Sequence, residues 1–171
     1  MSTDKHYHSR VSMALDDLTR CRAYAQQMLK LRIGESFSDE RTVYEALFVS
    51  LIVSYGRVFT TSNTTEQEYK QAVSTSFGEF RARVKLNFTT NEQSMHDQIV
   101  HKRHTAIAHS DASSRNYQHF NDSPLGFGNN PFLPFEHCEV VSILKLVDKL
   151  INYLAIEQDE VADKAFTNRL L

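Results

Sequence analysis

The positions of the prolines constrain the fold of this chain more than any other feature of its sequence. All three, Pro124, Pro131 and Pro134, fall in one stretch, and two of the five glycines, Gly126 and Gly128, lie in it too. The rest of the chain lacks the residue that most strongly breaks helices. An all-β protein needs turn-forming residues every ten residues or so, and this chain does not supply them. We therefore expect long helices on both sides of one irregular segment.

Apolar residues recur at helical spacing through most of the chain, which supports the same expectation. The spacing predicts helices over about 4–31, 38–59, from 65, from 89, and over about 135–158, with one or two further turns in 159–171. Thr65 with Glu68, and Thr89 with Glu92, have the three-residue separation of a capping box, which opens the third and fourth helices. The fold class is therefore predicted as all-α, an antiparallel bundle of four or five helices.

The second predicted helix, capped by Ser38 or Asp39, is apolar over nearly its whole circumference between Val43 and Val53. A helix of that kind belongs at the centre of a bundle. With 171 residues, of which 41% are hydrophobic, the chain suits a single domain spanning 1–171. The Pro/Gly/aromatic segment at about 110–134 is long for a loop in such a domain. It is either a connector with a few anchoring aromatics or a lid over a site.

Charge and cysteine usage point to a cytoplasmic protein. The 19 Lys and Arg nearly balance the 21 Asp and Glu, which excludes a polybasic chain that coats nucleic acid. The first ten residues hold no apolar signal core, and polar residues interrupt the most apolar stretch, 43–58. Cys21 and Cys138 form no CxxC pair, which argues against a structural disulfide or zinc site and for a reducing compartment.

Arg103 is the most informative single residue. It projects from the middle of the apolar sector that Met95, Ile99 and Ile107 define on the fourth helix, whereas its neighbours Lys102 and His104 are expected to point away from that sector. Burying a guanidinium costs several kcal/mol unless it is paired. Arg103 therefore pairs with a core carboxylate such as Glu45, lies at a subunit interface, or faces a polar cleft in which a ligand supplies the negative charge.

The string from Arg103 to Asp111, Arg-His-Thr-Ala-Ile-Ala-His-Ser-Asp, resembles the Arg-x(4–6)-His signature of HEPN domains. It is closer still to the variant in which Ala-His-Ser-Asp follows the arginine. The segment Ser54–Thr60 is similar to the helix that faces the motif in such bundles. The resemblance covers most of the chain in architecture and about nine residues in motif.

That resemblance implies a metal-independent endoribonuclease of toxin or phage-defence type, or an inactive relative, with no cofactor. Active members form homodimers in which two motifs meet at one cleft, and an antitoxin or defence partner is expected. His109 suits general acid–base catalysis near neutral pH, and Arg103 suits a phosphate clamp. Ser110 or Asp111 would orient the imidazole. The family pattern commonly has a tyrosine, the target of a neutralising modification, where this chain has Asp111.

Arg57 and His104 are further candidates for the same cleft. Arg57 follows Tyr55 on the central helix, although a surface or salt-bridged arginine explains it equally well. His104 directly follows Arg103. A non-catalytic HEPN-like interaction or dimerisation module remains the alternative function, because a histidine near a helix C-terminus is favoured electrostatically without any catalysis.

Two other patterns in the sequence are each typical of a functional site. His96, His101, His104 and His109 suggest a metal-dependent helical enzyme, but they do not converge with an obvious third ligand, so no metal site is assigned. Arg81, Arg83 and Lys85 form a basic row with phenylalanines close by in sequence. Such a row makes either a groove for single-stranded RNA or the solvated face of an amphipathic helix.

Overall fold

The described part of the chain is helical apart from one small pair of strands. The computed structural model describes residues 3–31, 38–60, 67–104, 118–120, 126–127 and 134–166. The elements are α1 (Thr3–Met28), α2 (Asp39–Phe59), α3 (Gln67–Gln71), a π-helical segment (Ala72–Ser76), α4 (Phe77–Leu86), α5 (Thr90–Lys102), β1 (Gln118–His119), β2 (Gly126–Phe127) and α6 (His137–Phe166). The two strands pair antiparallel over two residues each, inside the segment expected to be a loop. The prediction of an all-α fold is confirmed.

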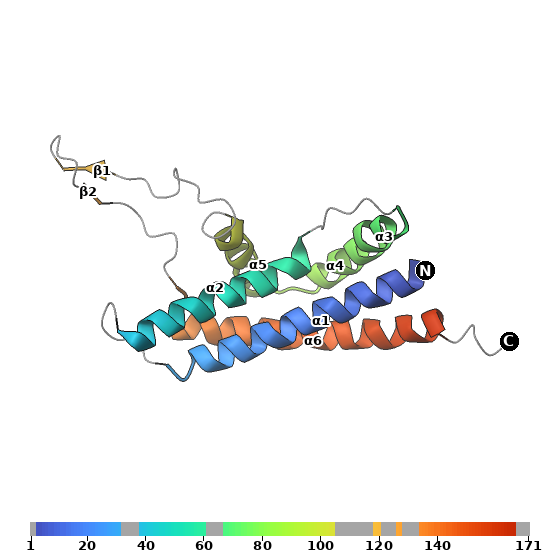
Figure 1. Cartoon of the computed structure of the whole chain (residues 1–171), viewed down its shortest axis with the longest axis horizontal. Coiled ribbons are helices and arrows are strands. Elements are labelled where there is room, and N and C mark those ends of the chain that lie inside the picture. Colours follow the sequence, from blue (N-terminus) through green and yellow to red (C-terminus); the bar gives the residue numbers. More distant parts are fainter. Residues whose placement is uncertain are drawn as a thin grey trace.

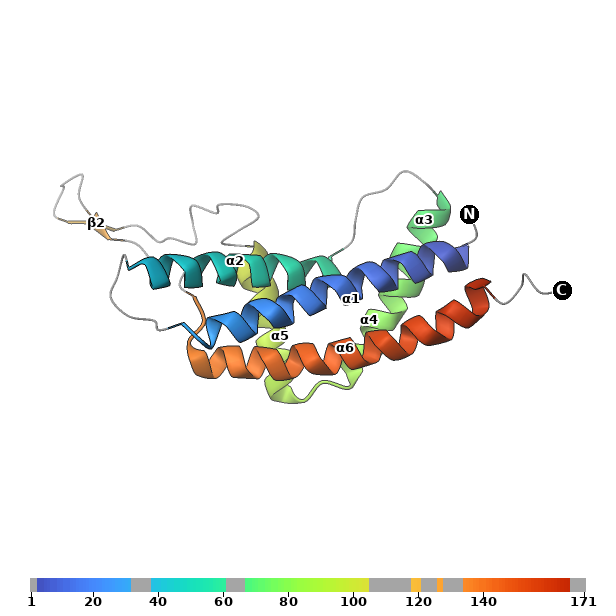
Figure 2. The same cartoon turned by 60° about the horizontal axis from the view of Figure 1, so that its bottom comes forward.

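Three long helices, α1, α2 and α6, form the body of the bundle. Helix α1 runs antiparallel to both α2 and α6 and packs most extensively against those two (Figure 1). Helices α4 and α5 cross this layer steeply on one side, α5 against α2 and α4 near the N-terminal half of α1 (Figure 2). The end of α2 therefore lies close to both crossing helices.

The core lies where the three long helices meet. Leu18, Leu51 and Ile143 are fully buried there, one from each of these helices. At one end of the bundle the Tyr44 hydroxyl donates to the Phe135 carbonyl at 2.6 Å, which fixes the entry to α6 against α2. At the other end Arg10 of α1 donates to the carbonyls of Arg57 at 2.9 Å and Val58 at 3.5 Å, which satisfies two of the last carbonyls of α2.

The all-round apolar pattern of α2 predicts a helix at the centre of the bundle, but α1 holds that place: it lies between α2 and α6 and packs against both, whereas α2 and α6 make little contact with each other (Figure 2). The length and composition of α2 also meet the usual criterion for crossing a membrane, with a mean hydropathy of 1.3, and among the described residues it is the one helix that does so. Of that stretch, 44% is buried inside the bundle. The core helix of a bundle and a spanning helix share these properties, so the composition alone does not separate them.

The helix starts follow their capping residues. The Ser38 side chain, rather than that of Asp39, caps α2 by accepting from the Arg41 N–H at 3.1 Å. The predicted capping box of Thr89 and Glu92 is confirmed, with both reciprocal hydrogen bonds present at the start of α5. The other proposed box includes Thr65, which lies outside the described residues.

One helix differs from the expectation. The third predicted helix is interrupted by the π-helical segment Ala72–Ser76, which contains the poor helix formers Ser74, Thr75 and Ser76. Helix α6 continues without a break to Phe166, so the one or two further turns expected in 159–171 belong to the same helix. Val161, seven residues after Leu154, is buried and so extends the inward face.

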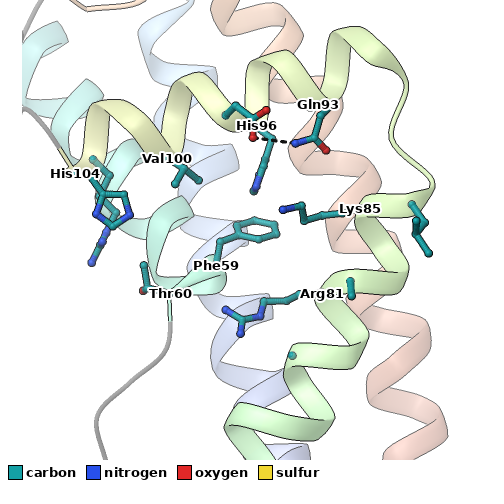
Figure 3. Close-up of a pocket in the computed structure, with 13 residues that line it drawn as sticks. Phe59, Thr60, Arg81, Lys85, Gln93, His96, Val100 and His104 are labelled. Carbon is teal, nitrogen blue, oxygen red and sulfur yellow. Dashed lines mark hydrogen bonds between the residues drawn. The ribbon is translucent and has the colours of Figure 1, made fainter.

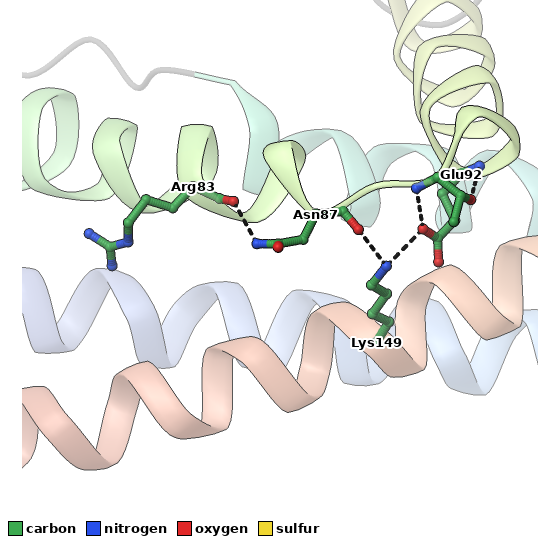
Figure 4. A network of polar contacts seen from close by, with 5 residues as sticks. Arg83, Asn87, Glu92 and Lys149 are labelled. Atoms are coloured by element: carbon green, nitrogen blue, oxygen red, sulfur yellow. Dashed lines mark hydrogen bonds and ion pairs between the residues drawn. The ribbon is translucent and has the colours of Figure 1, made fainter.

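A polar network ties the turn between α4 and α5 to α6 (Figure 4). Lys149 Nζ donates to the Asn87 carbonyl and to Glu92 Oε2, both at 2.8 Å. The same Glu92 oxygen accepts from the Thr89 N–H at 2.7 Å. The Asn87 side chain donates in turn to the Arg83 carbonyl at 3.0 Å. Lys149 thus fixes the angle between the two crossing helices.

Candidate functional site

A cleft of about 1210 Å³ lies between α4 and α5, with the end of α2 at its base (Figure 3). Helix α2 contributes Phe59, and Thr60 follows directly after it. Helices α4 and α5 form the two walls, and Arg103 and His104 extend the α5 wall. The Arg10 hydrogen bonds fix the end of α2 against α1, and the Lys149 network fixes the turn between α4 and α5 against α6.

The cleft is positively charged because three cations share its lining. Arg81 and Lys85 come from successive turns of α4, and Arg103 comes from the end of α5. Among the described residues, none of the three has an ion-pair partner, and Asp97 is the one acidic residue of the lining. Burial lowers the pKa of Arg81, but an arginine remains charged at neutral pH. The cleft is therefore suited to binding an anion.

Arg83, the third member of the basic row, lies on a different face of α4. Its guanidinium pairs with Glu157 of α6 at 2.8 Å. The Tyr7 hydroxyl donates to the other oxygen of the same carboxylate. The spacing of Arg81 and Lys85, four residues apart, puts these two on one helical face, and Arg83 falls outside it. The basic row is thus divided between a cleft and a structural ion pair.

Arg103 follows the last turn of α5, and its backbone N–H bonds to the carbonyls of Ile99 and Val100. Its side chain is half-buried and lies directly against Gly56 of α2. A Cβ atom on Gly56 would overlap Arg103 Cδ and lie 2.6 Å from Nε. Only glycine at position 56 therefore leaves room for the arginine in this position.

The structure argues against one of the three alternatives raised for Arg103. Glu45, the core carboxylate considered as its partner, instead accepts from Arg41 Nε at 2.7 Å. Arg103 lines a basic cleft, where either a ligand or a second subunit can supply the negative charge, so these two alternatives stay predictions.

Arg57 is not brought together with Arg103 in the cleft. Its guanidinium lies 3.3 Å from Asp17 of α1, which is the salt-bridged alternative considered from the sequence. His104 does line the cleft and is exposed. Lys102 was expected to point away from the apolar sector of its helix. Its ammonium lies 5.7 Å from the Phe48 ring of α2 and 5.2 Å from the Phe135 ring just before α6, so aromatic side chains partly cover it.

His109, Ser110 and Asp111 lie outside the described residues, as do most of 110–134. The resemblance-based roles of these three residues therefore stay predictions. Among the described residues, no group of three or more His, Cys, Asp or Glu side chains converges as a metal site would require. Of the histidines considered for a metal, His101 and His104 are exposed on α5 and just beyond it, whereas His96 is buried.

His96 belongs to an aromatic cluster at the base of the cleft. The side chain is 3% exposed, and its Nδ1 lies 2.9 Å from the Tyr55 hydroxyl. The Phe59 ring stacks on Tyr55 with centroids 5.0 Å apart and meets the His96 ring edge-on at 4.4 Å. Burial, with a further contribution from the Lys85 charge, lowers the pKa of His96 to about 4. The imidazole is therefore neutral at pH 7.

Sequence reasoning missed Gly56 and Phe59 of this site, and it considered His96 only as a metal ligand. A lone glycine inside an apolar helix is a signal that another group approaches the backbone closely. His96 is seven residues before Arg103, and hence on the same face of α5. The sequence contained both signals, but neither identified its partner on another helix.

Taken together, the cleft offers cations for phosphate, an apolar ring for stacking and a neutral imidazole that can form hydrogen bonds. It has the chemistry of a site for a negatively charged ligand with flat, partly apolar groups. Compared with known proteins, the chain matches no family model, no curated protein and no solved structure.

Proposed function

We propose that this protein is a HEPN-like domain that binds single-stranded RNA in the cleft between α4 and α5 and cleaves it without a metal ion. The observation that carries the proposal is that Arg103, the arginine of the HEPN-like motif, shares its cleft with Arg81 and Lys85. Three cations and the Phe59 ring give the backbone of a single strand its phosphate contacts and one of its bases a stacking surface.

The reaction we propose is the internal cleavage of RNA through its own 2′-hydroxyl group. His109 removes the proton of the 2′-hydroxyl or donates one to the leaving 5′-oxygen, and a second copy of the chain in a homodimer supplies the other of these two steps. Arg103 stabilises the extra negative charge on the phosphorus-bound oxygens in the transition state. In this proposal a toxin or phage-defence system is the setting, in the cytoplasm, with an antitoxin as the partner.

A second function has one observation in its favour. The Arg103 stem packs against Gly56, so the arginine also holds the end of α5 against α2. This contact suits a non-catalytic HEPN-like module, in which the motif arginine stabilises the bundle and the surface of the domain binds a partner protein.

RNA cleavage in the presence of EDTA distinguishes the two functions. The wild type, Arg103→Ala, Arg103→Lys and His109→Ala are compared, with Arg20→Ala, an exposed arginine of α1, as the matched control. The nuclease proposal expects EDTA-resistant cleavage that falls by about 10²-fold or more in the Arg103→Ala and His109→Ala variants and is unchanged in Arg20→Ala.

The other outcomes contradict the nuclease proposal in different ways. A wild type that binds RNA and leaves it intact supports the interaction module. Cleavage that EDTA abolishes supports the metal-dependent alternative. Equal cleavage by all the variants would show that neither Arg103 nor His109 is catalytic.

A further inference from the structure

The base of the cleft holds a flat aromatic ring at a fixed orientation. Phe59 is half-exposed at the end of α2, where Tyr55 stacks on it with an interplanar angle of 29° and His96 meets it at 73°. Figure 3 shows Phe59 in the middle of the cleft, with His96 above it and Arg81 below it. Unpaired bases of single-stranded RNA stack on rings of this kind. Tyr55 and His96 fix the orientation of Phe59, and the part of the ring that lines the cleft is left for a base to stack on.

The Tyr55–His96 hydrogen bond fixes which nitrogen of His96 carries the proton. Tyr55 is fully buried, and among the described residues its hydroxyl has no acceptor other than His96 Nδ1. If Nδ1 donated to the hydroxyl oxygen, the buried hydroxyl proton would have no partner, which is costly. Tyr55 therefore donates to Nδ1, and the proton of the neutral imidazole is on Nε2. His96 consequently presents an N–H donor at the base of the cleft.

The other polar groups nearest the Phe59 ring are donors as well. The Lys85 ammonium extends toward Phe59 and His96, and the Arg81 guanidinium lies on the opposite side of the ring (Figure 3). Neither a lysine nor an arginine accepts hydrogen bonds. Gln93 donates to Asp97 at 2.8 Å on α5, which leaves acceptor oxygens on both, but Figure 3 shows Gln93 farther from the Phe59 ring than Lys85 and His96 are. A base lying on Phe59 therefore meets donors at its edge.

We infer that Phe59, His96 and Lys85 form a base-binding subsite that selects keto bases, uracil or guanine, over amino bases. The carbonyl O4 of uracil or O6 of guanine accepts from these donors, whereas the exocyclic amino group of cytosine or adenine is itself a donor and meets them unfavourably. This inference rests on the proposed function, since it needs RNA to enter the cleft.

The test compares short single strands that differ at position 4 of the pyrimidine and at N3, which carries a proton in uracil and not in the other two bases. Octamers of uridine, cytidine and 2-pyrimidinone riboside carry a carbonyl, an amino group and a hydrogen at position 4. Their 2′-O-methyl backbones prevent cleavage through the 2′-hydroxyl. Binding to the full chain is measured by fluorescence anisotropy. We expect the uridine strand to bind at least about fivefold more tightly than the cytidine strand, with 2-pyrimidinone between them.

Variants assign the preference to the subsite. Replacing both partners of the buried hydrogen bond, Tyr55→Phe with His96→Phe, should bring the uridine and cytidine affinities to within about twofold of each other. Phe59→Leu should weaken all three strands by about fivefold or more, because it removes the stacking surface. The matched control His101→Phe changes an exposed histidine of α5 and should leave the preference intact.

The outcomes separate this inference from the proposed function. If the wild type binds the three strands equally and Arg81→Ala weakens all of them, the cleft binds RNA but the keto subsite is wrong. If the wild type binds none of them, the proposed function fails and the subsite with it. The comparison between strands needs no variant, so a misfolded His96 variant would not prevent the inference from being overturned.

Discussion

Gly56 determines where the Arg103 side chain can lie. The aliphatic part of the arginine occupies the space in which any other residue would place its Cβ. A glycine inside a helix lowers stability by about 0.5–1 kcal/mol relative to alanine. Helix α2 is well packed on both sides of this position by Tyr55 and Val58. The glycine therefore weakens α2 at the point where the motif arginine contacts it.

Gly56→Ala should displace Arg103 without removing its charge. We expect RNA cleavage to fall nearly as far as in Arg103→Ala, whereas the free energy of unfolding stays within about 1 kcal/mol of wild type, because the gain in helix propensity offsets the lost packing of the arginine stem. Cleavage rates and urea unfolding measure the two quantities.

Gly78→Ala is the matched control for this substitution. Gly78 is also helical, but its Cβ would lie 3.8 Å from Arg81 Nη2, which is an ordinary contact. This variant should gain the same helix propensity and keep its cleavage activity. If Gly56→Ala cleaves RNA as fast as wild type, the position of Arg103 against α2 is not needed for the reaction.

At the scale of elements, the width of the cleft depends on how α4 and α5 are held. Few of the contacts among the helices join α5 to α6. Lys149 of α6 supplies an ion pair to Glu92 of α5 and a hydrogen bond to the Asn87 carbonyl in the turn before α5. Glu92 serves twice, since it caps the start of α5 and pairs with Lys149. These hydrogen bonds, the Lys149 contact first, hold the pKa of Glu92 below its ordinary value.

Lys149→Met should lower the free energy of unfolding at pH 7 by about 1 kcal/mol, because it removes the ion pair and the bond to the Asn87 carbonyl while keeping the length of the side chain. A carboxylate with a lowered folded-state pKa stabilises the protein above its unfolded pKa and loses that contribution as the pH falls through the folded value. The difference between the variant and wild type should therefore shrink below about pH 4.5.

Urea unfolding between pH 7 and pH 3 measures that difference. Lys145→Met is the control, since Lys145 is exposed one turn earlier on the same helix. It should leave the stability unchanged within about 0.5 kcal/mol at every pH. A difference between Lys149→Met and wild type that does not vary with pH would show that Glu92 is not the residue through which Lys149 acts.

At the scale of the whole molecule, the sequence predicted what depends on local spacing and not what depends on packing between helices. The Thr89–Glu92 capping box follows from a pattern within one segment, and so do the further turns expected in 159–171, which are the continuation of α6 to Phe166. The central position of α1 between α2 and α6 depends on packing, and the apolar pattern of α2 pointed to the wrong helix. The break at Ala72–Ser76 was missed because Phe77, Phe80 and Val84 fit helical spacing, so the pattern gave no sign of a π-helical turn before them.

The residues of the candidate site also fall into those that a pattern within one helix predicts and those that depend on packing between helices. Arg103 could be identified because an arginine in an apolar sector is conspicuous within its own helix. Arg81 and Lys85 fit a solvated face equally well, and only the crossing of α4 and α5 makes that face one wall of a cleft. The contact between Arg103 and Gly56 joins residues 47 positions apart in the chain. No pattern within either helix specifies such a pair.

The charge of the whole molecule is a poor guide to how it should bind RNA. The formal net charge is −2, which by itself disfavours a polyanion. Charges farther apart than about 8 Å are largely screened at physiological ionic strength, so a strand in the cleft responds mainly to Arg81, Lys85 and Arg103. Each phosphate contact with a single strand contributes about −0.7 to the slope of log K against log salt concentration.

We therefore expect a slope of about −2 for a single-stranded octamer, and about −1.4 after either Arg81→Ala or Lys85→Ala. Lys145→Ala removes the same charge from α6, outside the cleft, and should leave the slope unchanged. Anisotropy titrations between 50 and 200 mM salt give these slopes. If Lys145→Ala changed the slope as much as Arg81→Ala does, RNA would be bound by the overall field of the protein. If only the substitutions of cleft cations change the slope, the strand is bound in the cleft. A wild-type slope of about −2 then corresponds to three phosphates, one for each of Arg81, Lys85 and Arg103.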